Sequence, residues 1–373
     1  MGTISLRVSV VDLSRCSMKK RTILPVIECF GSEYEIGRQY GEQAADHIRE
    51  SVSLMCSTMI AMPYMAEKNA VLAASKAYLN NVRSFDPEAL DRVKGMAEGS
   101  GMSFDEIFAL QCYSELFVNY PRLAALCTSF GVTGSATSDG RTIIGQNVDW
   151  HPDATIDLVR ITRKDGLRML VLFLCGYAAY YLTSEGIGNC ANLTLCPPAA
   201  VTNHVPFAFY HYVAMRQKTA REAMEVLKNI SRGVGYIHIA GADGTMQGIE
   251  SNYHECQLME PVKGVLVHGN HYETDRFKKH DLAYTYIQDS FHRSGRMREL
   301  IASAHGTLTP EKMMVILTDH RGHPKSVCTH VDPKVPAVFA SLSVASFVML
   351  PAEGKMYIAA GPPCENEFVE YQV

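Results

Sequence analysis

The chain has 373 residues, of which 47% are hydrophobic and 20% are charged, so it is long and apolar enough to bury a large core. Its formal net charge is −4, and its lysines and arginines are scattered, which argues against a surface for nucleic acid. No apolar run reaches the roughly 20 residues that a membrane-spanning helix needs. The longest candidate, residues 169–182, is interrupted by tyrosines and a glycine and predicts buried strands.

The N-terminal segment and the cysteines bear on the cellular location. A basic cluster at residues 19–21 is followed by no apolar core and no small-residue cleavage site, so we expect residues 1–26 to be an extension rather than a secretory signal. The eleven cysteines are odd in number and show no C-x-x-C spacing. They predict free thiols and a reducing, cytoplasmic location.

The segment from residue 33 to residue 117 has a helical pattern. Its apolar residues recur every three or four positions, beginning with Tyr34, Ile36 and Tyr40. Asp86-Pro87 predicts a break between helices, and residues 103–106 resemble a capping box that starts the next helix. We therefore expect a helical opening section.

After residue 127 the pattern changes to β-branched segments joined by tight turns. Turn dipeptides typical of antiparallel hairpins occur at Asp139-Gly140, Asp165-Gly166, Asp243-Gly244 and Glu353-Gly354. Helical stretches lie between the strands, at residues 207–217, 220–229 and 282–303, and another follows Thr309-Pro310. With no repeat and no linker, the sequence predicts one α+β sandwich domain over residues 27–373.

Cys127 is the first candidate for chemistry, because it stands just before one of these hairpins. A peptide cut before Cys127 would expose an α-amino group with a pKa near ~8, which could serve as the base for its own thiol. Asp149 ends the returning strand, so its carboxylate should lie near the start of the hairpin. The alternatives are a buried core cysteine and a surface aspartate, both of which are common.

Several blocks of the sequence resemble the penicillin acyltransferase family of N-terminal nucleophile hydrolases. They lie in the family's order along the chain, at residues 31–41, 90–99, 107–115, 127–132, 142–149, 185–192 and 267–272. The resemblance implies a four-layer αββα sandwich with two antiparallel sheets between helical layers. It also implies self-cleavage into chains 1–126 and 127–373, which would remain associated.

The resemblance assigns roles to four residues. Cys127 would be the nucleophile, and Asp149 would hold the ammonium group that cleavage creates. Asn270 would donate its side-chain amide to the oxyanion of the tetrahedral intermediate. Asn192 would be an auxiliary oxyanion donor or a substrate contact.

The chain departs from the family in two respects. Leu126 stands where many members have glycine before the nucleophile, which puts self-cleavage in doubt. The family's later arginine is not placed by the sequence, although Arg293, Arg296 and Arg298 are candidates, and Thr329 stands where relatives often have arginine.

Two histidine pairs have an i,i+3 spacing that could suggest metal ligands. Neither His268 and His271 nor His320 and His323 has the H-E-x-x-H pattern on a helix, and the second pair lies in a turn-like sequence. The sequence therefore predicts no metal and no cofactor.

The sequence favours a cysteine amide hydrolase or acyltransferase. It would cleave a linear amide of a small molecule through a thioester acyl-enzyme and pass the acyl group to water or to an amine. The resemblance includes an acyl-CoA thioester among the expected acyl donors. The alternative is an unprocessed, noncatalytic binding protein that keeps the same fold.

Overall fold

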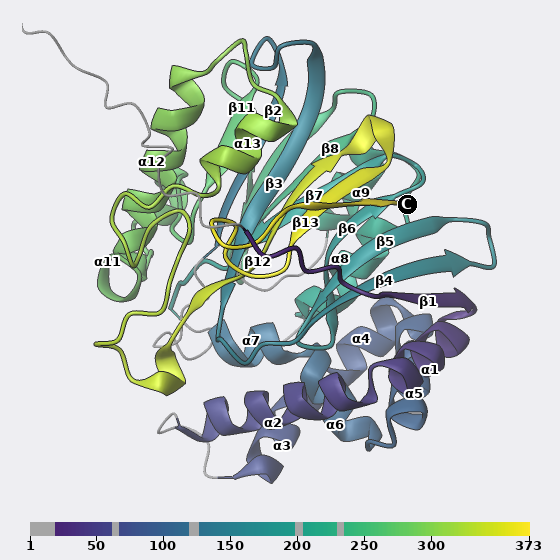
Figure 1. Ribbon diagram of the computed structural model, residues 1–373. Helices are drawn as coiled ribbons and strands as arrows, with labels where there is room; N and C mark the ends of the chain where they lie inside the picture. The colour runs from purple at the N-terminus through teal and green to yellow at the C-terminus, as the bar shows by residue number, and fades with distance from the viewer. Residues whose placement is uncertain (1–18, 62–66, 119–126, 198–203, 230–234) are drawn as a thin grey trace, which may run out of the picture.

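The fold consists of two β-sheets that face each other between layers of helices. The computed structural model describes residues 19–61, 67–118, 127–197, 204–229 and 235–373. Within these residues one sheet has eight strands in the order β1-β4-β5-β6-β7-β8-β9-β10, and the other has six in the order β11-β2-β3-β12-β13-β14. Figure 1 shows the two sheets side by side, with helices on the outer faces. The predicted α+β sandwich is therefore confirmed.

The strands have the following bounds. The eight-stranded sheet contains β1 (Val26–Gly31), β4 (Ile156–Arg163), β5 (Arg168–Leu174), β6 (Tyr177–Thr183), β7 (Ile187–Asn192), β8 (Gly235–Gly241), β9 (Met246–Ser251) and β10 (Cys256–Met259). The six-stranded sheet contains β2 (Thr128–Gly134), β3 (Gly140–Trp150), β11 (Val265–His268), β12 (Leu342–Leu350), β13 (Lys355–Ala359) and β14 (Val369–Gln372).

The helices before Cys127 form one group below the eight-stranded sheet in Figure 1. They are α1 (Glu33–Gln43), α2 (Ala45–Ala61), α3 (Lys68–Lys76), α4 (Leu79–Phe85), α5 (Pro87–Ser100), α6 (Phe104–Gln111) and α7 (Tyr113–Val118). The predicted break is confirmed, since α4 ends at Phe85 and α5 starts at Pro87. The predicted capping box is also confirmed, because Ser103 and Glu106 bond to each other's backbone N–H groups at the start of α6.

The later helices cover the outer faces of both sheets. Helices α8 (Phe207–Met215) and α9 (Ala220–Asn229) pack on the eight-stranded sheet, and α12 (Asp289–Ser303) and α13 (Pro310–Ile316) pack on the six-stranded sheet. The expected helix over 282–303 is split, because the short α11 (Ala283–Tyr286) ends before α12 begins. Further short elements are α10 (Asp275–Lys278) and the 3-10 turns η1 (Ala337–Phe339) and η2 (Pro351–Glu353).

All four predicted hairpin turns are present. They join β2 to β3, β4 to β5, β8 to β9 and β12 to β13, and each pair of strands is antiparallel. The glycine of each turn has a positive φ, between 61° and 89°, which other residues adopt only under strain. The turn glycines therefore explain why the sequence identifies these hairpins.

One strand pair departs from the expected antiparallel sheets. β1 runs parallel to β4, with Val26 opposite Leu158 and Gly31 opposite Arg163. Parallel neighbours need a long connection, and here more than 120 residues, including seven helices and the β2–β3 hairpin, separate the two strands. A local pattern in the sequence could not reveal such a distant pairing.

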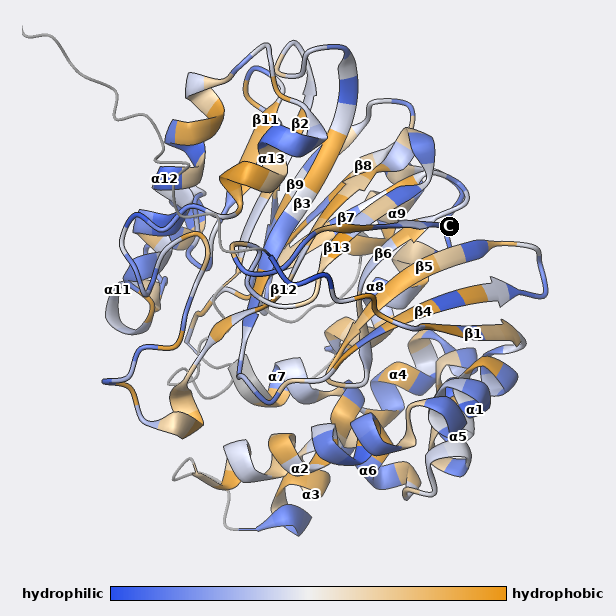
Figure 2. Ribbon diagram, viewed as in Figure 1, coloured by the Kyte–Doolittle hydropathy of each residue, from blue (hydrophilic) through white to orange (hydrophobic). Residues whose placement is uncertain are grey.

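The described residues form three apolar clusters, of which the two largest pack against the sheets. The larger cluster fills the space between the sheets and extends to the helices on the eight-stranded sheet; in it the rings of Tyr180 on β6 and Phe347 on β12 lie 5.0 Å apart. A smaller cluster lies between the six-stranded sheet and helices α12 and α13. Figure 2 shows β5 as mostly hydrophobic, whereas β3 becomes hydrophilic toward the end that carries Asp149. The apolar core therefore ends near the polar end of β3, which carries a candidate site residue.

Two further sequence predictions can be compared with the fold. Residues 169–182 form the buried strands β5 and β6, as predicted, and no helix in the described part of the chain has the length and apolar character to span a bilayer. Of the expected N-terminal extension, residues 19–25 are described, and Lys20 exchanges backbone hydrogen bonds with Glu365 and Glu367. Residues 1–18 and Leu126 lie outside the described residues.

Candidate active site

The β2–β3 hairpin brings the candidate nucleophile and the candidate carboxylate together. Thr128 on β2 is paired with Asn147 on β3, so the chain two residues further along β3 lies beside the start of β2. Cys127 is 3% exposed and Asp149 is fully buried, and the backbone N–H of Asp149 interacts with the Cys127 thiol. The antiparallel return thus positions both groups through a single turn.

Asp149 is held by two hydroxyl groups from outside the hairpin. Ser343 Oγ on β12 donates to Oδ1 at 2.6 Å, and Thr329 Oγ1 donates to Oδ2 at 2.9 Å. Burial nevertheless raises the pKa of Asp149 to about 7, although the Arg293 guanidinium 4.0 Å away opposes this shift. The carboxyl group is therefore poised near neutrality, where a new positive charge beside it would favour its ionised form.

Arg293, one of the three arginines that the sequence left as candidates, contacts the backbone of Cys127. Its side chain is fully buried, and Nη1 donates to the backbone oxygen of Cys127 at 2.9 Å and to Thr128 Oγ1 at 2.6 Å. Nε donates to Asp289 at 2.9 Å, one helical turn earlier on α12. The i,i+4 spacing of Asp289 and Arg293 was the signal that could have found it.

The other two arginines of α12 lie elsewhere. Arg296 forms its ion pair with Asp319, and Arg298 donates to the backbone oxygen of Val267 and to Glu273. Neither contacts Cys127 through a described hydrogen bond or ion pair, so Arg293 is the one of the three that fixes the start of β2.

The thiol of Cys127 is protonated in the uncleaved chain. Burial raises its pKa to about 12, and the nearby charge of Asp149 acts in the same direction. The backbone N–H of Asp149, the charge of Arg293 and the hydroxyl of Tyr180 lower it, but they do not outweigh the burial. Because the thiolate is the reactive form, the intact chain holds Cys127 as a weak nucleophile.

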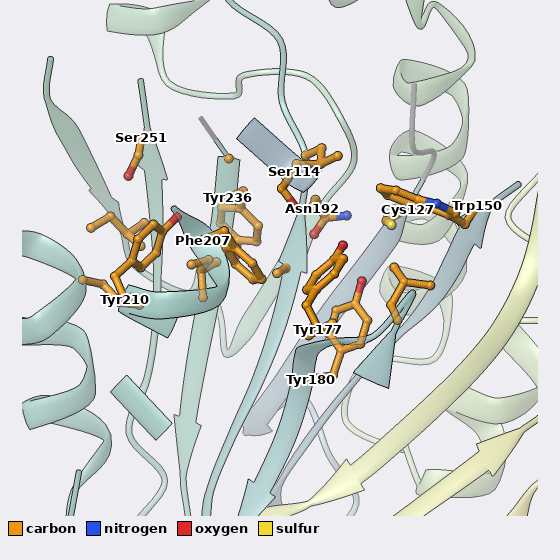
Figure 3. A pocket seen from close by; sticks show the side chains of 18 residues that line it. Ser114, Cys127, Trp150, Tyr177, Tyr180, Asn192, Phe207, Tyr210, Tyr236 and Ser251 are labelled. Carbon is orange, nitrogen blue, oxygen red and sulfur yellow. The ribbon is translucent and has the colours of Figure 1, made fainter. Parts of the chain in front are cut away.

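A pocket with mostly apolar walls opens beside Cys127. Figure 3 shows Tyr177 and Tyr180 pointing their hydroxyls toward the end of the pocket where Cys127 and Asn192 lie. The rest of the wall comes from both sheets and from helices α7, α8 and α9. It comprises Ser114, Trp150, Leu174, Ala179, Ala191, Leu193, Phe207, Tyr210, Leu227, Gly235, Tyr236, Ile237, Ile249 and Ser251. Such a lining, apolar with a few polar groups near one end, is typical of small-molecule sites.

The two candidate asparagines differ in how they are engaged. Asn192, at the end of β7, lines the pocket; its Oδ1 accepts from Ser129 Oγ at 2.6 Å, and its Nδ2 reaches the His268 oxygen only at 3.4 Å. The side-chain amide of Asn192 is therefore weakly engaged and faces the pocket.

Asn270 lies behind this wall and is bonded more tightly. Its Oδ1 accepts from Arg293 Nη2 at 3.0 Å, and its Nδ2 donates to the Leu193 oxygen at 2.9 Å. Asn270 is not among the residues that line the pocket. In this geometry Asn270 joins Arg293 to the segment that follows Asn192, and its predicted role as an oxyanion donor stays a prediction.

The first histidine pair has partners other than a metal. His268 Nε2 lies 2.8 Å from Glu250 Oε1, with both side chains fully buried, and Glu250 also accepts from the backbone N–H of Thr274 at 3.1 Å. His271 Nδ1 lies 2.8 Å from Ser290 Oγ. These contacts tie the loop after β11 to its neighbours.

The family comparison covers the part of the chain from the start of α8 to the segment before β14. Residues 207–365 match the family model described as acyl-coenzyme A:6-aminopenicillanic acid acyl-transferase. The resemblance to the penicillin acyltransferase family is confirmed. The acyltransferase match includes Asn270 and Arg293, whereas Cys127 and Asp149 precede it. A comparison with curated proteins found no match.

Two solved structures with partial similarity to this chain are a bile acid hydrolase and a penicillin acylase. A mutant of the conjugated bile acid hydrolase from Clostridium perfringens is 12% identical, with a TM-score of 0.43, and the match covers 66% of this chain and 97% of that one. The penicillin V acylase from Agrobacterium tumefaciens is 12% identical, also with a TM-score of 0.43, over 63% of this chain and 83% of that one.

Proposed function

We propose that this chain is a self-processing cysteine amide hydrolase or acyltransferase whose nucleophile is Cys127. One observation carries the proposal: the thiol lies at the end of an apolar pocket, while the backbone of the same residue is held by Arg293 and interacts with Asp149. A core cysteine would need neither a pocket nor a buried cation at its carbonyl oxygen. The family match beyond residue 207 supports the same chemistry.

The first step would cut the peptide bond before Cys127. The thiol attacks the carbonyl carbon of Leu126, and its proton passes to the nitrogen of Cys127 as the C–N bond breaks, so the acyl group moves from nitrogen to sulfur. Water then hydrolyses this thioester and leaves a free carboxylate on Leu126 and a free amine and thiol on Cys127. Asp149 would stabilise the new ammonium group, because its buried carboxyl lies beside Cys127 and gains a partner of opposite charge.

Turnover would use the new amine as the base. It takes the thiol proton as sulfur attacks the substrate amide, and it later protonates the leaving amine as the C–N bond breaks. Asn192 would donate to the oxyanion from the pocket wall, and Asn270 would either donate as well or position Arg293. A second nucleophile, water or an amine, then releases the acyl group from the thioester.

The pocket favours a substrate with an apolar acyl group. Its wall combines the rings of Trp150, Phe207 and Tyr236 with several aliphatic side chains, and no lysine, arginine, aspartate or glutamate is among the lining residues in the described part of the chain. A charged acyl chain would lose its hydration without gaining a partner there. An aliphatic or aromatic carboxamide, or the corresponding acyl-CoA thioester as donor, would fit these walls.

Intact mass spectrometry of the denatured protein tests the proposal. The wild-type chain should give two fragments that meet between Leu126 and Cys127. Cys127→Ala should give only the full-length mass and no amidase activity, whereas Cys127→Ser should be cleaved slowly, because a hydroxyl can also accept the acyl group. Cys256→Ser, at a partly buried cysteine on β10, is the matched control and should process like the wild type.

Two results would contradict the proposal. Normal turnover by Cys127→Ala would remove Cys127 from the reaction. A wild-type chain that stays at full length and shows no hydrolysis of apolar carboxamides would leave the noncatalytic binding protein as the better explanation.

A further inference from the structure

Four cysteine and histidine side chains gather outside the site described above. His320 follows α13, Cys328 and His330 lie in the segment before β12, and Cys364 lies between β13 and β14. The His320 Nε2, Cys328 Sγ, His330 Nε2 and Cys364 Sγ atoms all lie within 4.8 Å of one another. In the sequence His320 is paired with His323 by its i,i+3 spacing, and no such spacing links either residue to Cys364.

Four of the six distances between these atoms are close to the edges of a tetrahedral zinc site. With Zn–S bonds of about 2.3 Å and Zn–N bonds of about 2.0 to 2.1 Å, ideal edges are about 3.8 Å for S···S, 3.6 Å for S···N and 3.3 Å for N···N. The observed Cys328 Sγ···Cys364 Sγ distance is 3.6 Å, and His330 Nε2 lies 3.6 Å from Cys328 Sγ and 3.4 Å from Cys364 Sγ. The two Nε2 atoms of His320 and His330 lie 3.1 Å apart.

The surroundings hold these groups in place. The backbone N–H of Cys328 donates to the Asp319 oxygen at 3.0 Å, and that of His330 donates to the Pro324 oxygen at 2.9 Å. The far ring nitrogen of His330, Nδ1, lies 3.8 Å from Glu365, an arrangement that resembles the carboxylate–histidine pairs behind many metal ligands.

We propose that His320, Cys328, His330 and Cys364 bind one structural zinc ion. Two thiolates and two neutral imidazoles form a soft ligand set whose charge balances that of tetrahedral Zn²⁺. Because the protein supplies all four ligands, no position stays open for water, and the ion supports structure rather than catalysis. Binding displaces the thiol protons and any proton on the imidazoles, so affinity should fall in acid.

The position of the cluster connects it to the candidate active site. Thr329, between the ligands Cys328 and His330, donates its hydroxyl to Asp149, and its backbone N–H donates to Ser343 Oγ at 3.0 Å. Asn147, two residues before Asp149, donates to the backbone oxygens of Leu317 and Val327. A zinc ion would therefore join residues 320–330 to the C-terminal segment and hold in place the Thr329 hydroxyl that bonds to Asp149.

Metal analysis of the full-length, tag-free protein tests this proposal. Wild-type protein purified under reducing conditions should contain about one zinc ion per chain, and Cys328→Ser, Cys364→Ser and His330→Ala should each lose most of it. His323→Ala removes the neighbouring histidine that is not a ligand, and Cys256→Ser removes a cysteine outside the cluster, so both should keep the ion. Cobalt exchanged into the wild type should give the intense visible bands of a tetrahedral thiolate site.

The wild type alone provides a second measurement, in case the ligand variants fold poorly. A strong chelator should lower its melting temperature, and added zinc should restore it. The proposal fails if the purified wild type contains no zinc and takes up none, or if its metal content matches that of the ligand variants. It also fails if Cys328 and Cys364 are joined by a disulfide in protein purified under reducing conditions. None of these results depends on cleavage or turnover at Cys127.

Discussion

Cys127 and Cys364 show how differently one fold can treat the same side chain. Cys127 is enclosed by aromatic and aliphatic residues beside a buried carboxyl group, and its thiol pKa rises to about 12. Cys364 lies among Cys328, His320 and His330, and its thiol pKa is lowered. The Cys127 thiol therefore keeps its proton in the intact chain, whereas the Cys364 thiol loses its proton more easily, as a metal ligand must.

The two sites differ in whether a new backbone terminus is needed before the cysteine can act. The Cys364 site is complete as it stands, because imidazole groups and a second sulfur are already within 4.8 Å. The Cys127 site lacks a base until a peptide bond is cut, since no histidine lies among the residues that line its pocket in the described part of the chain. Variants that affect one cysteine and spare the other therefore test the comparison.

The broadest effect is expected from Arg293→Lys, because it should slow two reactions, self-cleavage and turnover. A lysine keeps the positive charge, but its single ammonium cannot reach Cys127, Thr128 and Asn270 together as the guanidinium does. Misplacing the nucleophile should slow both cleavage and turnover by on the order of 10²-fold. The rate of fragment formation and kcat/KM measure these two effects.

Arg298→Lys is the matched control, because it lies on the same helix and donates to Val267 and Glu273 instead. It should cleave itself and turn over nearly as the wild type does, and both variants should keep their zinc. Wild-type kinetics in Arg293→Lys would show that the contact with Cys127 is only structural.

Alanine variants of the two asparagines should differ in how far they lower kcat. If Asn270 donates to the oxyanion, Asn270→Ala should lower kcat by roughly 10²- to 10³-fold, or about 2.7 to 4 kcal/mol. Asn192→Ala should have a smaller effect, because Asn192 is expected to be auxiliary. A larger loss in Asn192→Ala would move the oxyanion role to the pocket wall, and unchanged kinetics in Asn270→Ala would remove Asn270 from the site. Thermal unfolding of each variant separates loss of fold from loss of rate.

The last effect is on stability rather than on rate, and it concerns a proton on Asp149. In the uncleaved chain its pKa is about 7, above the ordinary value of 3.8, so between these pH values the folded chain holds a proton that the unfolded chain has lost. Stability should therefore fall as the pH rises through this window, by up to about 1.4 kcal/mol per pH unit from this group. Urea denaturation of Cys127→Ala, which stays uncleaved, measures the slope.

Adding Asp149→Asn to Cys127→Ala should flatten that slope, since the amide cannot ionise. Other buried acids, such as Glu115, contribute equally to both proteins and cancel in the comparison. Equal slopes would mean that Asp149 is already ionised in the uncleaved chain.

Local signals made much of the fold predictable. Glycine turns with positive φ, the Ser103 capping box and the Thr309 cap, which accepts from the backbone N–H of Lys312, depend on neighbouring residues alone. The hairpin between Cys127 and Asp149 was predictable for the same reason, because a short turn fixes which residues return together.

Contacts between distant segments were not predictable from these signals. The choice of Arg293 among three arginines depends on how α12 packs against β2 and β11, and the zinc cluster needs Cys364 to meet residues 320–330. Asn270 is bonded more tightly than Asn192 because it contacts the carbonyl oxygen of Leu193 and the guanidinium of Arg293. Both groups lie more than 20 residues from Asn270 in the sequence. No spacing rule links such residues.

The parallel edge strand β1 has a consequence for the proposed fragments. β1 belongs to the segment before Cys127, whereas its partner β4 belongs to the segment after it. The pairing runs from Val26 opposite Leu158 to Gly31 opposite Arg163. A cut at Cys127 would turn this pairing into donor-strand complementation, in which one polypeptide completes the sheet of another. The first fragment would thus cover an edge that would otherwise be free to recruit a foreign strand.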